Sequence, residues 1–533
     1  MTIESIPISE FPLFSKIDRE LNQNSSSLTE FQEWAPIKEN FKNIIDQRKL
    51  PVDRSVLQAV LFDQYAELPA RPGIDTQIRS LGDEYTFTVT TAHQPCLFTG
   101  PAFVISKAIS TIKLARQLNE TLNNHHIVPL FVIGSEDHDV EELNHSYLFG
   151  KKITWDTHQS GPVGRFDQEA IQSCLDEATE LMQYTSFGPA LIELLKEAHQ
   201  PNKNFAQSFQ YILNGLLGEF GLLVLNTDEK RLKEIFKPFI LDEIIHSTSK
   251  PLILETQKKL NNLGFEEVTH VRDINLFYFG NGFRDRIERE NSHYKVLNQE
   301  KTFDESAIRE EVNLYPEKFS PNVILRPLYQ EIILPNLAYV GGGGELSYWL
   351  ERKSQFAALG IPYPMLVRRD SFQVITPEQK NIMDQYNLTI TELAMRTDML
   401  LNYLTEKLSA NQLNVAAETE NLMGWMDKIK IKAQDIDPTL GPSIEAEKIK
   451  LLKTIEHLEK KMLKAEKSKL EVKLNKIKKL KEKLFPENGL QERNESFLTY
   501  YAEYGRDLIF TLLEDFDPLD RRFKLIQVAK PAE

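Results

Sequence analysis

The stretch VPLFVIGSEDHDVEELNH (residues 128–145) decides the fold, because an apolar segment passes directly into a dense group of charges. Its first six residues are mostly apolar, which is typical of a buried strand. Glu136, Asp137 and Asp139 then crowd around His138. Since neighbouring carboxylates repel one another, the chain must hold something at this point that offsets the cost.

Further short apolar segments repeat this pattern and alternate with helical stretches. The sequence predicts other strands at residues 85–91, 221–226, 322–327, 337–340 and 363–369. A helix is expected from about Pro101 to Asn119, between the first two strands. Strands that alternate with helices indicate an α/β fold with a largely parallel sheet.

The C-terminal third has the spacing of a coiled coil. Apolar residues separated by steps of four and three form a heptad seam at Leu451, Ile455, Leu458, Met462 and Ala465. The phase slips at Leu470 and the pattern then continues to Leu484. An earlier helical stretch, 377–436, ends at the turn DIDPTLGPS, so we expect two long helices in an antiparallel hairpin.

These patterns divide the chain into a core with two insertions and a helical domain. We expect the core at 1–150, 216–250 and 321–375, a mainly helical insertion at 151–215 and a second insertion at 251–320, with polar loops such as RDRIERENSHYK. The coiled-coil domain is expected at 376–515. Residues 516–533 are expected to return to the core.

Composition and charge exclude several classes of protein. The net charge of −15 argues against general nucleic-acid binding, because a phosphate backbone selects basic surfaces. The sequence contains no run of eighteen apolar residues, so no membrane span is expected. Its N-terminus also lacks the pattern of a signal peptide. Two cysteines in 533 residues suit a reducing cytoplasm and exclude a disulfide framework or a cysteine-rich zinc module.

The segment TAHQPCLFTGPAF (91–103) lies where an open α/β sheet binds its ligands, just beyond the carboxyl end of a strand. A helix N-terminus at this place suits a phosphate or a carboxylate, and His93 and Gln94 add donors. The alternative is a plain strand-to-helix turn shaped by Gly100 and Pro101.

The acidic group at 136–139 allows three interpretations. Its Asp and His side chains could ligate a metal ion, although the spacing matches no common metal motif. It could be the solvated start of a helix, which favours acids. It could also bind a cationic group, an ammonium or the Mg²⁺ of a nucleotide, with His138 available for proton transfer. We adopt the third interpretation.

Four successive glycines, Gly341 to Gly344, lie between a predicted strand and a helix. Glycines allow backbone amides to turn toward an anion and allow a ligand to approach closely. Neither a Walker A loop nor a dinucleotide fingerprint fits this run, and a tight turn is the simpler alternative. Arg326, just upstream, favours anion binding because guanidinium pairs well with carboxylate or phosphate.

Together these motifs resemble one family, the bacillithiol biosynthesis cysteine-adding enzymes. The matching pieces are HQPCLFTGP with SKAISTIKLA, SEDHDVEELNH, and RPLYQEIILPNLAYVGGGGELSYWLE. The resemblance implies a Rossmann-like core similar to nucleotidylyltransferases, connective insertions and a coiled-coil domain that mediates homodimerisation. It also implies a ligase that joins L-cysteine to the amine of glucosaminyl malate, the last step of bacillithiol biosynthesis, by forming a carbon–nitrogen bond.

Combined with this resemblance, the motifs predict the site. The predicted catalytic residues are Asp137, His138 and Asp139, and the predicted substrate-binding residues are His93, Gln94, Glu136, Arg326, Gly341, Gly342, Gly343 and Gly344. We expect no metal and no tightly bound cofactor, with ATP as a possible cosubstrate. Two alternatives stay open: a metal-dependent hydrolase that uses Asp137, His138, Asp139 and His145, and a non-enzymatic coiled-coil scaffold with a degenerate nucleotide-binding core.

Overall fold

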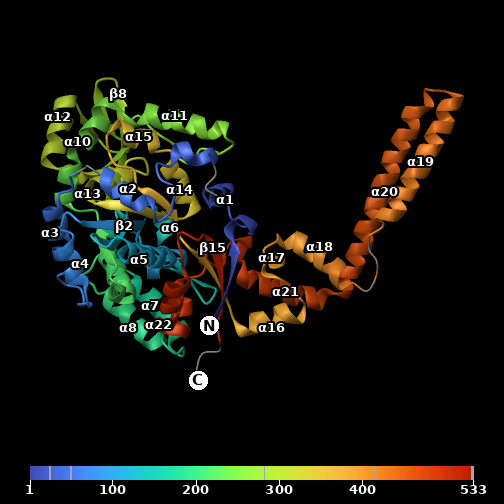
Figure 1. The fold of residues 1–533 in the computed structure, drawn as a ribbon, viewed down its shortest axis with the longest axis horizontal. Helices are drawn as coiled ribbons and strands as arrows, with labels where there is room; N and C mark the ends of the chain where they lie inside the picture. Colours follow the sequence, from blue (N-terminus) through green and yellow to red (C-terminus); the bar gives the residue numbers. More distant parts are fainter. Residues whose placement is uncertain (23–25, 49–50, 281, 410, 412–413, 530–533) are drawn as a thin grey trace. The chain divides into compact units, whose positions relative to one another are not determined.

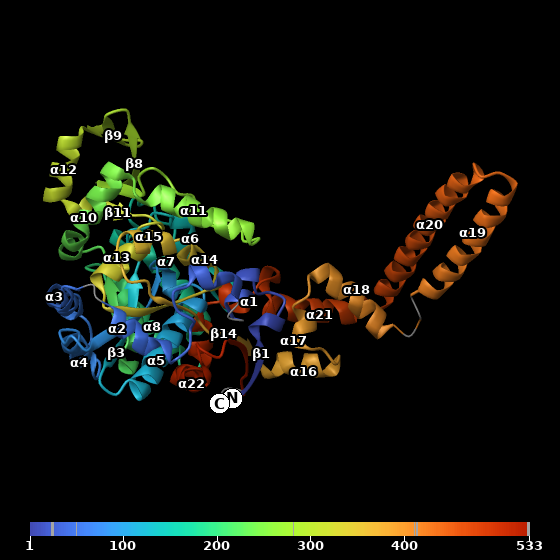
Figure 2. The ribbon, with the colours of Figure 1, turned by 45° about the horizontal axis from the view of Figure 1, so that its top comes forward.

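The structure is a computed structural model that forms two compact units. It describes residues 1–22, 26–48, 51–280, 282–409, 411 and 414–529. The first unit comprises Met1–Ile375 with Glu492–Glu533, and the second comprises Thr376–Gln491. Figures 1 and 2 show the elements of each unit.

The first unit is built on a parallel five-stranded sheet. Its strands are β2 (Thr86–His93), β3 (His126–Ile133), β6 (Leu223–Asn226), β12 (Asn336–Gly341) and β13 (Met365–Arg368). They are arranged in the order β13-β12-β2-β3-β6. The chain therefore winds outward from β2 in both directions, which confirms the predicted Rossmann-like α/β fold and places the topological switch point between β2 and β12.

Both faces of the sheet are buried, which explains why its strands are almost continuously apolar. Along β3, Phe131 and Ile133 join one core cluster, while Leu130 and Val132 join the other. The first cluster contains buried residues from the first half of α5 (Phe103–Thr121), the crossover from β2 to β3. The second contains buried residues of α10 (Lys230–His246).

Two insertions extend this core. The first, between β3 and β6, contains α6 (Val140–Leu143), β4 (His145–Leu148), β5 (Lys151–Thr154), α7 (Ile171–Met182), α8 (Gly188–Ala198) and α9 (Phe205–Leu217). The second, between β6 and β12, contains α10, α11 (Ser249–Asn262), β7 (Leu276–Gly280), β8 (Phe283–Glu290), β9 (His293–Val296), β10 (Lys301–Phe303), α12 (Glu305–Leu314), β11 (Phe319–Pro321) and α13 (Arg326–Ile333). Further helices of this unit are α1 (Lys16–Asn22), α2 (Asn40–Gln47), α3 (Arg54–Tyr65), α4 (Ile74–Ser80), α14 (Gly343–Leu350) and α15 (Lys353–Ala358).

Two sequence predictions in the second insertion are wrong. The polar segment 284–295, expected as a loop, forms most of β8 and β9 of an antiparallel sheet of order β10-β9-β8-β7-β11. Its alternating charged residues belong to a half-exposed antiparallel strand, which such a sheet allows. The strand predicted at 322–327 is instead a turn followed by the start of α13 at Arg326, where Pro327 occupies the first helical turn that favours proline.

The second compact unit ends at Gln491, before residue 515, where the sequence places the end of the helical domain. Helix α22 (Phe497–Asp515) belongs to the first unit, since its apolar residues Leu508 and Leu512 join the same core cluster as α5. Beyond it, β15 (Arg522–Gln527) lies between β1 (Thr2–Pro7) and β14 (Ser371–Ile375) in a three-stranded sheet. Both ends of the chain therefore belong to one small sheet.

All secondary-structure elements in the described part of the second unit are helices. It contains α16 (Pro377–Gln385), α17 (Ile390–Leu393), α18 (Thr397–Leu408), α19 (Ala416–Ile436), α20 (Leu440–Lys469) and α21 (Glu471–Leu484). Helices α19 and α20 form the predicted antiparallel hairpin, and the phase slip at Leu470 coincides with the break between α20 and α21. The continuous helix expected at 377–436 is instead divided into four. Over the described residues, no helix has the length and apolar character needed to cross a membrane.

Candidate functional site at the carboxyl ends of the strands

The first predicted motif lies at the switch point. His93 is the last residue of β2, and its ring packs edge-on against Phe103 with 5.3 Å between ring centroids. Its Nδ1 lies 2.9 Å from the carbonyl oxygen of Gln94. Burial and the nearby positive charge of Lys107 lower the pKa of His93 to about 4. His93 is therefore a neutral hydrogen-bonding group at neutral pH.

The acidic motif after β3 meets the first motif directly. Gln94 donates from Nε2 to Oδ2 of Asp137 over 3.0 Å, and Nη1 of Arg284 lies 3.5 Å from Oδ1. Burial alone would raise the pKa of Asp137, but the charge of Arg284 and hydrogen bonds from Gln94 and from the backbone amide of His138 hold this pKa well below its usual range. Asp137 is thus a permanently charged carboxylate that is bound by the protein itself, and it is a weak base.

A second internal cation accompanies Glu136. Lys233, fully buried in α10, donates to Oε1 of Glu136 over 2.6 Å and to the carbonyl oxygen of Phe319 over 3.0 Å. Burial raises the pKa of Glu136 in spite of the attraction of Lys233. The protein therefore offsets its clustered carboxylates with its own Lys233 and Arg284.

This pairing changes the interpretation of the acidic motif as a cation site. Glu136 and Asp137 are each engaged by an internal cation, whereas the side chain of Asp139 is exposed and makes no hydrogen bond to any described residue. His138 is also exposed. If the motif recognises an amine, Asp139 is the carboxylate available for it.

At the other side of the switch point, a buried ion pair ties β2 to β12. Lys107 of α5 is fully buried and donates to both carboxylate oxygens of Glu345, at 2.9 and 2.8 Å, and to the carbonyl oxygen of Ala92 at 2.8 Å. Glu345 also accepts from Tyr339 and from the amide of Gly342, at 2.8 and 3.0 Å. Burial would raise the pKa of Glu345, but Lys107 and the Gly342 amide lower it to about 2.

The glycine run is shaped mainly by these internal contacts. Gly341 ends β12 and Gly342 is the N-cap of α14, where Glu345 closes a capping box. One amide of the run is therefore occupied by a side chain of the protein. Gly343 lies against Asp18 of α1, which itself accepts from Nε of Arg368 over 2.9 Å. Close packing of α1 thus requires glycine at residue 343.

This geometry predicts different effects at two neighbouring glycines. A Cβ at residue 343 would lie 2.2 Å from Oδ1 of Asp18, whereas a Cβ at Gly344 would have no heavy atom within 4 Å. We expect Gly343→Ala to lower the free energy of unfolding by about 1–3 kcal/mol, because a packed interface must open. The matched control, Gly344→Ala, should leave it unchanged or raise it by up to about 1 kcal/mol. Urea unfolding of both variants checks this, and equal losses would contradict it.

Arg326 stands out as a cation without an acidic partner. It is half-buried at the start of α13, where Nη1 lies 3.2 Å from Oε1 of Gln330 and Nη2 lies 3.0 Å from the hydroxyl of Tyr348. Burial would lower its pKa, but the Tyr348 and Tyr339 hydroxyl groups raise this pKa above its usual value. Within the described part of the chain, Arg326 forms no ion pair with a carboxylate. It can therefore receive an anion at the switch point.

The structure thus brings the three motifs to one edge of the sheet and adds four charged residues. These are Lys107, Lys233, Arg284 and Glu345. The sequence carried a local signal for two of them. Lys107 lies in the mostly apolar start of α5, and Glu345 follows Gly342 by three residues, the spacing of a capping box. Lys233 carried no signal, and the isolated position of Arg284 in a polar segment was equally compatible with an exposed loop.

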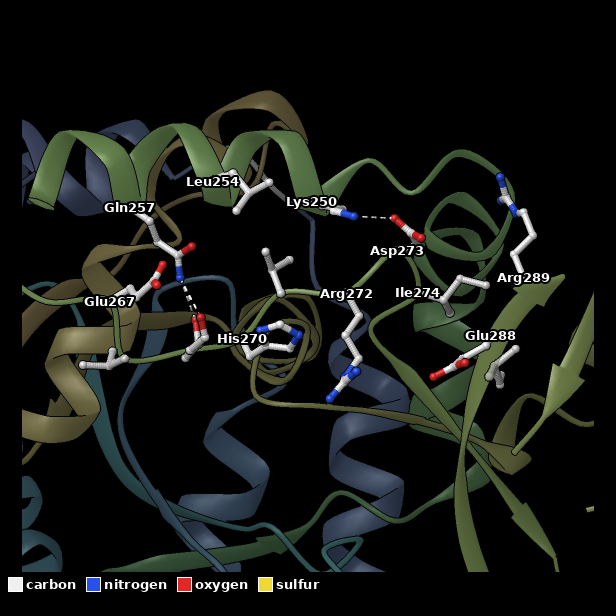
Figure 3. Close-up of a pocket in the computed structure, with 14 residues that line it drawn as sticks. Lys250, Leu254, Gln257, Glu267, His270, Arg272, Asp273, Ile274, Glu288 and Arg289 are labelled. Carbon is white, nitrogen blue, oxygen red and sulfur yellow. Dashed lines mark hydrogen bonds and ion pairs between the residues drawn. The ribbon is translucent and has the colours of Figure 1, made fainter. Parts of the chain in front are cut away.

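The structure also contains a separate hollow of about 790 Å³ beside α11 (Figure 3). None of the predicted site residues lines it. Figure 3 shows Lys250 facing Asp273, with 2.7 Å between Nζ and Oδ1. Gln257 donates from Nε2 to the carbonyl oxygen of Thr269 over 2.7 Å. Because none of the sequence motifs reaches this hollow, we retain the strand ends as the candidate site.

The hydrolase alternative requires a cluster of metal ligands. Over the described ranges, no three His, Cys, Asp or Glu side chains are grouped so that they could hold a metal ion. His145, proposed as one ligand, directs Nδ1 to the carbonyl oxygen of Glu141 over 3.1 Å. Three of the four residues of that alternative, Asp137, His138 and His145, are therefore used in other contacts.

Fold and site together define a class: Rossmann-like α/β proteins with connective insertions, a polar site at the switch point and an added helical unit. The model of the family described as "Bacillithiol biosynthesis BshC, N-terminal Rossmann-like domain" matches residues 1–370, and the corresponding C-terminal coiled-coil domain matches 372–528. The chain belongs to the bacillithiol biosynthesis BshC family, which confirms the resemblance seen in its sequence.

Relatives match along almost the whole chain. A protein from Christiangramia forsetii is 35% identical over 537 residues, covering 99% of each chain. One from Flavobacterium johnsoniae is 35% identical over 518 residues, covering 97% of this chain and 98% of the relative. One from Bacillus mycoides is 26% identical over 502 residues, covering 91% and 92%. All three bear the name "Putative cysteine ligase BshC".

Proposed function

We propose that this protein is a cytoplasmic ligase that joins the carboxyl group of L-cysteine to the amine of glucosaminyl malate, in the last step of bacillithiol biosynthesis. Membership of the family and the cysteine ligase name of its full-length relatives support this activity. Two buried cysteines, Cys96 and Cys174, both free thiols, suit a reducing compartment.

One observation supports the substrate most directly: Arg326 is a half-buried cation at the switch point whose two hydrogen-bond partners, Gln330 and Tyr348, are neutral. The malate part of the substrate carries two carboxylates at neutral pH. A guanidinium that forms no ion pair with a described carboxylate can bind one of them through paired hydrogen bonds. The neutral His93, close enough to feel the charge of Arg326, adds a polar group beside this position.

The chemistry assigns further roles. A carboxylate does not react with an amine unless it is activated, and ATP is the cosubstrate that would form an adenylate or an acyl phosphate. The amine nitrogen then attacks the carbonyl carbon of cysteine, the carbon–nitrogen bond forms, the activating group leaves with its electron pair, and the amine proton passes to a base. We propose that exposed Asp139 binds the amine and accepts this proton, because Asp137 is held by Gln94 and Arg284.

Thiol profiling of a strain that lacks the gene tests the pathway. The proposal predicts that glucosaminyl malate accumulates, that bacillithiol is absent, and that the wild-type gene restores it. Normal bacillithiol in the deletion strain would overturn the proposed function. If the wild-type gene restores bacillithiol and the gene with Arg326→Ala does not, the residue at the switch point is required for this step.

We also propose that the protein is a homodimer formed through α19 and α20. Within the hairpin, Leu451 and Ile455 of the seam are half-buried, whereas Leu458 and Met462 remain 52% and 39% exposed. Apolar side chains left uncovered along a coiled coil favour a second copy. We expect Leu458→Glu with Met462→Glu to convert a dimer into a monomer in light scattering.

A matched control adds the same charge elsewhere on the helix. Thr454→Glu with Ser468→Glu changes two exposed polar positions of α20 and should leave the dimer intact. A monomeric wild-type protein at micromolar concentration, or equal dissociation of both double variants, would contradict this assembly.

A further inference from the structure

One nearly buried arginine of the second insertion, Arg284, contacts the loop that follows β3. Arg284 of β8 is only 8% exposed, and its guanidinium lies 3.9 Å from the centroid of the Phe277 ring. Its Nε lies 3.1 Å from the hydroxyl of Ser320, and its Nη2 lies 3.4 Å from the carbonyl oxygen of Pro321. These contacts, together with Asp137, fix the guanidinium in one orientation.

The remaining contact of Arg284 determines the chemistry of His138. Nη1 lies 2.8 Å from Nδ1 of His138, and the imidazole also contacts the ring of Phe277, with 5.4 Å between centroids. Nδ1 also lies 3.5 Å from Oδ1 of Asp137, but that oxygen already accepts from the backbone amide of His138 over 2.8 Å. A guanidinium carries five N–H donors and no acceptor, so Nδ1 accepts the shorter hydrogen bond from Arg284 with its lone pair. The proton of the neutral imidazole then resides on Nε2.

The opposite edge of the ring remains accessible. The side chain of His138 is 44% exposed, in contrast to the buried Arg284 behind it. A neutral imidazole held in this way presents Nε2–H, a donor, to a molecule at the strand ends. It has no free lone pair with which to remove a proton from an amine.

We propose that Arg284 is a positioning residue that holds His138 as the Nε2–H tautomer, so that His138 donates a hydrogen bond to a substrate oxygen instead of acting as the base. The identity of that oxygen rests on the proposed function: it is a carboxyl or carbonyl oxygen of the activated cysteine. This role replaces the proton acceptor expected from the sequence. It agrees with the assignment of the proton to Asp139.

Nitrogen-15 NMR of the histidine rings tests the tautomer without any substrate, and so independently of the proposed function. In the full-length protein, at a pH where the imidazole is neutral, His138 should show a protonated Nε2 and an unprotonated Nδ1. Arg284→Met should produce a mixture of tautomers, while the control Arg286→Met, on the same strand, should not. A protonated Nδ1 in the wild-type protein would overturn the proposal.

Kinetics separate a donor from a base at the same residue. Glutamine retains an N–H donor near the position of Nε2, whereas leucine retains none. His138→Leu should lower kcat on the order of 10²-fold or more, as for the loss of one preorganised donor, and His138→Gln should keep most of the activity. Equal loss in both variants would identify His138 as the base and refute the donor role, and failure of the wild-type protein to ligate cysteine would refute only the proposed function.

Discussion

Lys107→Met is expected to lower the free energy of unfolding by about 3–5 kcal/mol, the usual cost of leaving one charge of a buried ion pair without its partner. The variant would leave the Glu345 carboxylate without its cation beside the switch point, and would remove the link from Lys107 to Ala92 in β2. Urea unfolding measures the loss. We expect ligation to fail as well, because Glu345 also holds the Gly342 amide.

The double variant Lys107→Met with Glu345→Gln is the matched control. It removes both charges, so much of the stability should return even though the single variant is strongly destabilised. A double variant that is as unstable as the sum of both single variants would contradict the importance of the pair.

The same ion pair predicts a pH dependence. The pKa of Glu345 is about 2 in the folded protein, below its value of about 4.3 in an unfolded chain. The carboxylate therefore contributes its full stabilisation above about pH 4.5, and this contribution is lost as the pH falls toward 2. Glu345→Gln should show a weaker fall in stability over that range than the wild-type protein.

Arg326→Ala is expected to weaken binding of glucosaminyl malate roughly 10- to 150-fold. This corresponds to the loss of about 1.5–3 kcal/mol for a charge-assisted hydrogen bond. The affinity of Arg326→Lys, which keeps the charge but not the paired donors, should lie between the affinities of Arg326→Ala and the wild-type protein. Calorimetry measures the affinity. Arg309→Ala, which removes an exposed arginine paired with Glu305, is the control and should have no effect.

The sequence predicted the parts of this protein that depend on local pattern. Apolar segments identified all five strands of the central sheet to within a few residues, but they also predicted a further strand at 322–327 that does not form. The heptad seam identified α20 with its break at Leu470. The end of the second compact unit, at Gln491, could not be predicted, because α22 is as helical as its neighbours. Only its packing beside α5 assigns it to the first unit.

The site was predictable in its position but not in its electrostatics. Strand ends placed His93, Gln94 and Asp137 together, and the contact between Gln94 and Asp137 joins two of the motifs. The cations that neutralise the acids come from positions 97 and 147 residues away along the chain, Lys233 for Glu136 and Arg284 for Asp137. Their partners are set by tertiary packing, so a cluster of acids in sequence looked like a cation site.

The rate of amide formation by the purified protein tests the central claim most directly. L-cysteine, glucosaminyl malate and ATP are mixed with wild type, Arg326→Ala or Arg272→Ala, and the product is followed by mass spectrometry at substrate concentrations below saturation. Arg272 lines the hollow beside α11 and not the strand ends. We predict a product with the combined mass of both substrates minus water, formed equally fast by wild type and Arg272→Ala and at least about tenfold more slowly by Arg326→Ala. No product from the wild-type protein, or a loss confined to Arg272→Ala, would contradict the account.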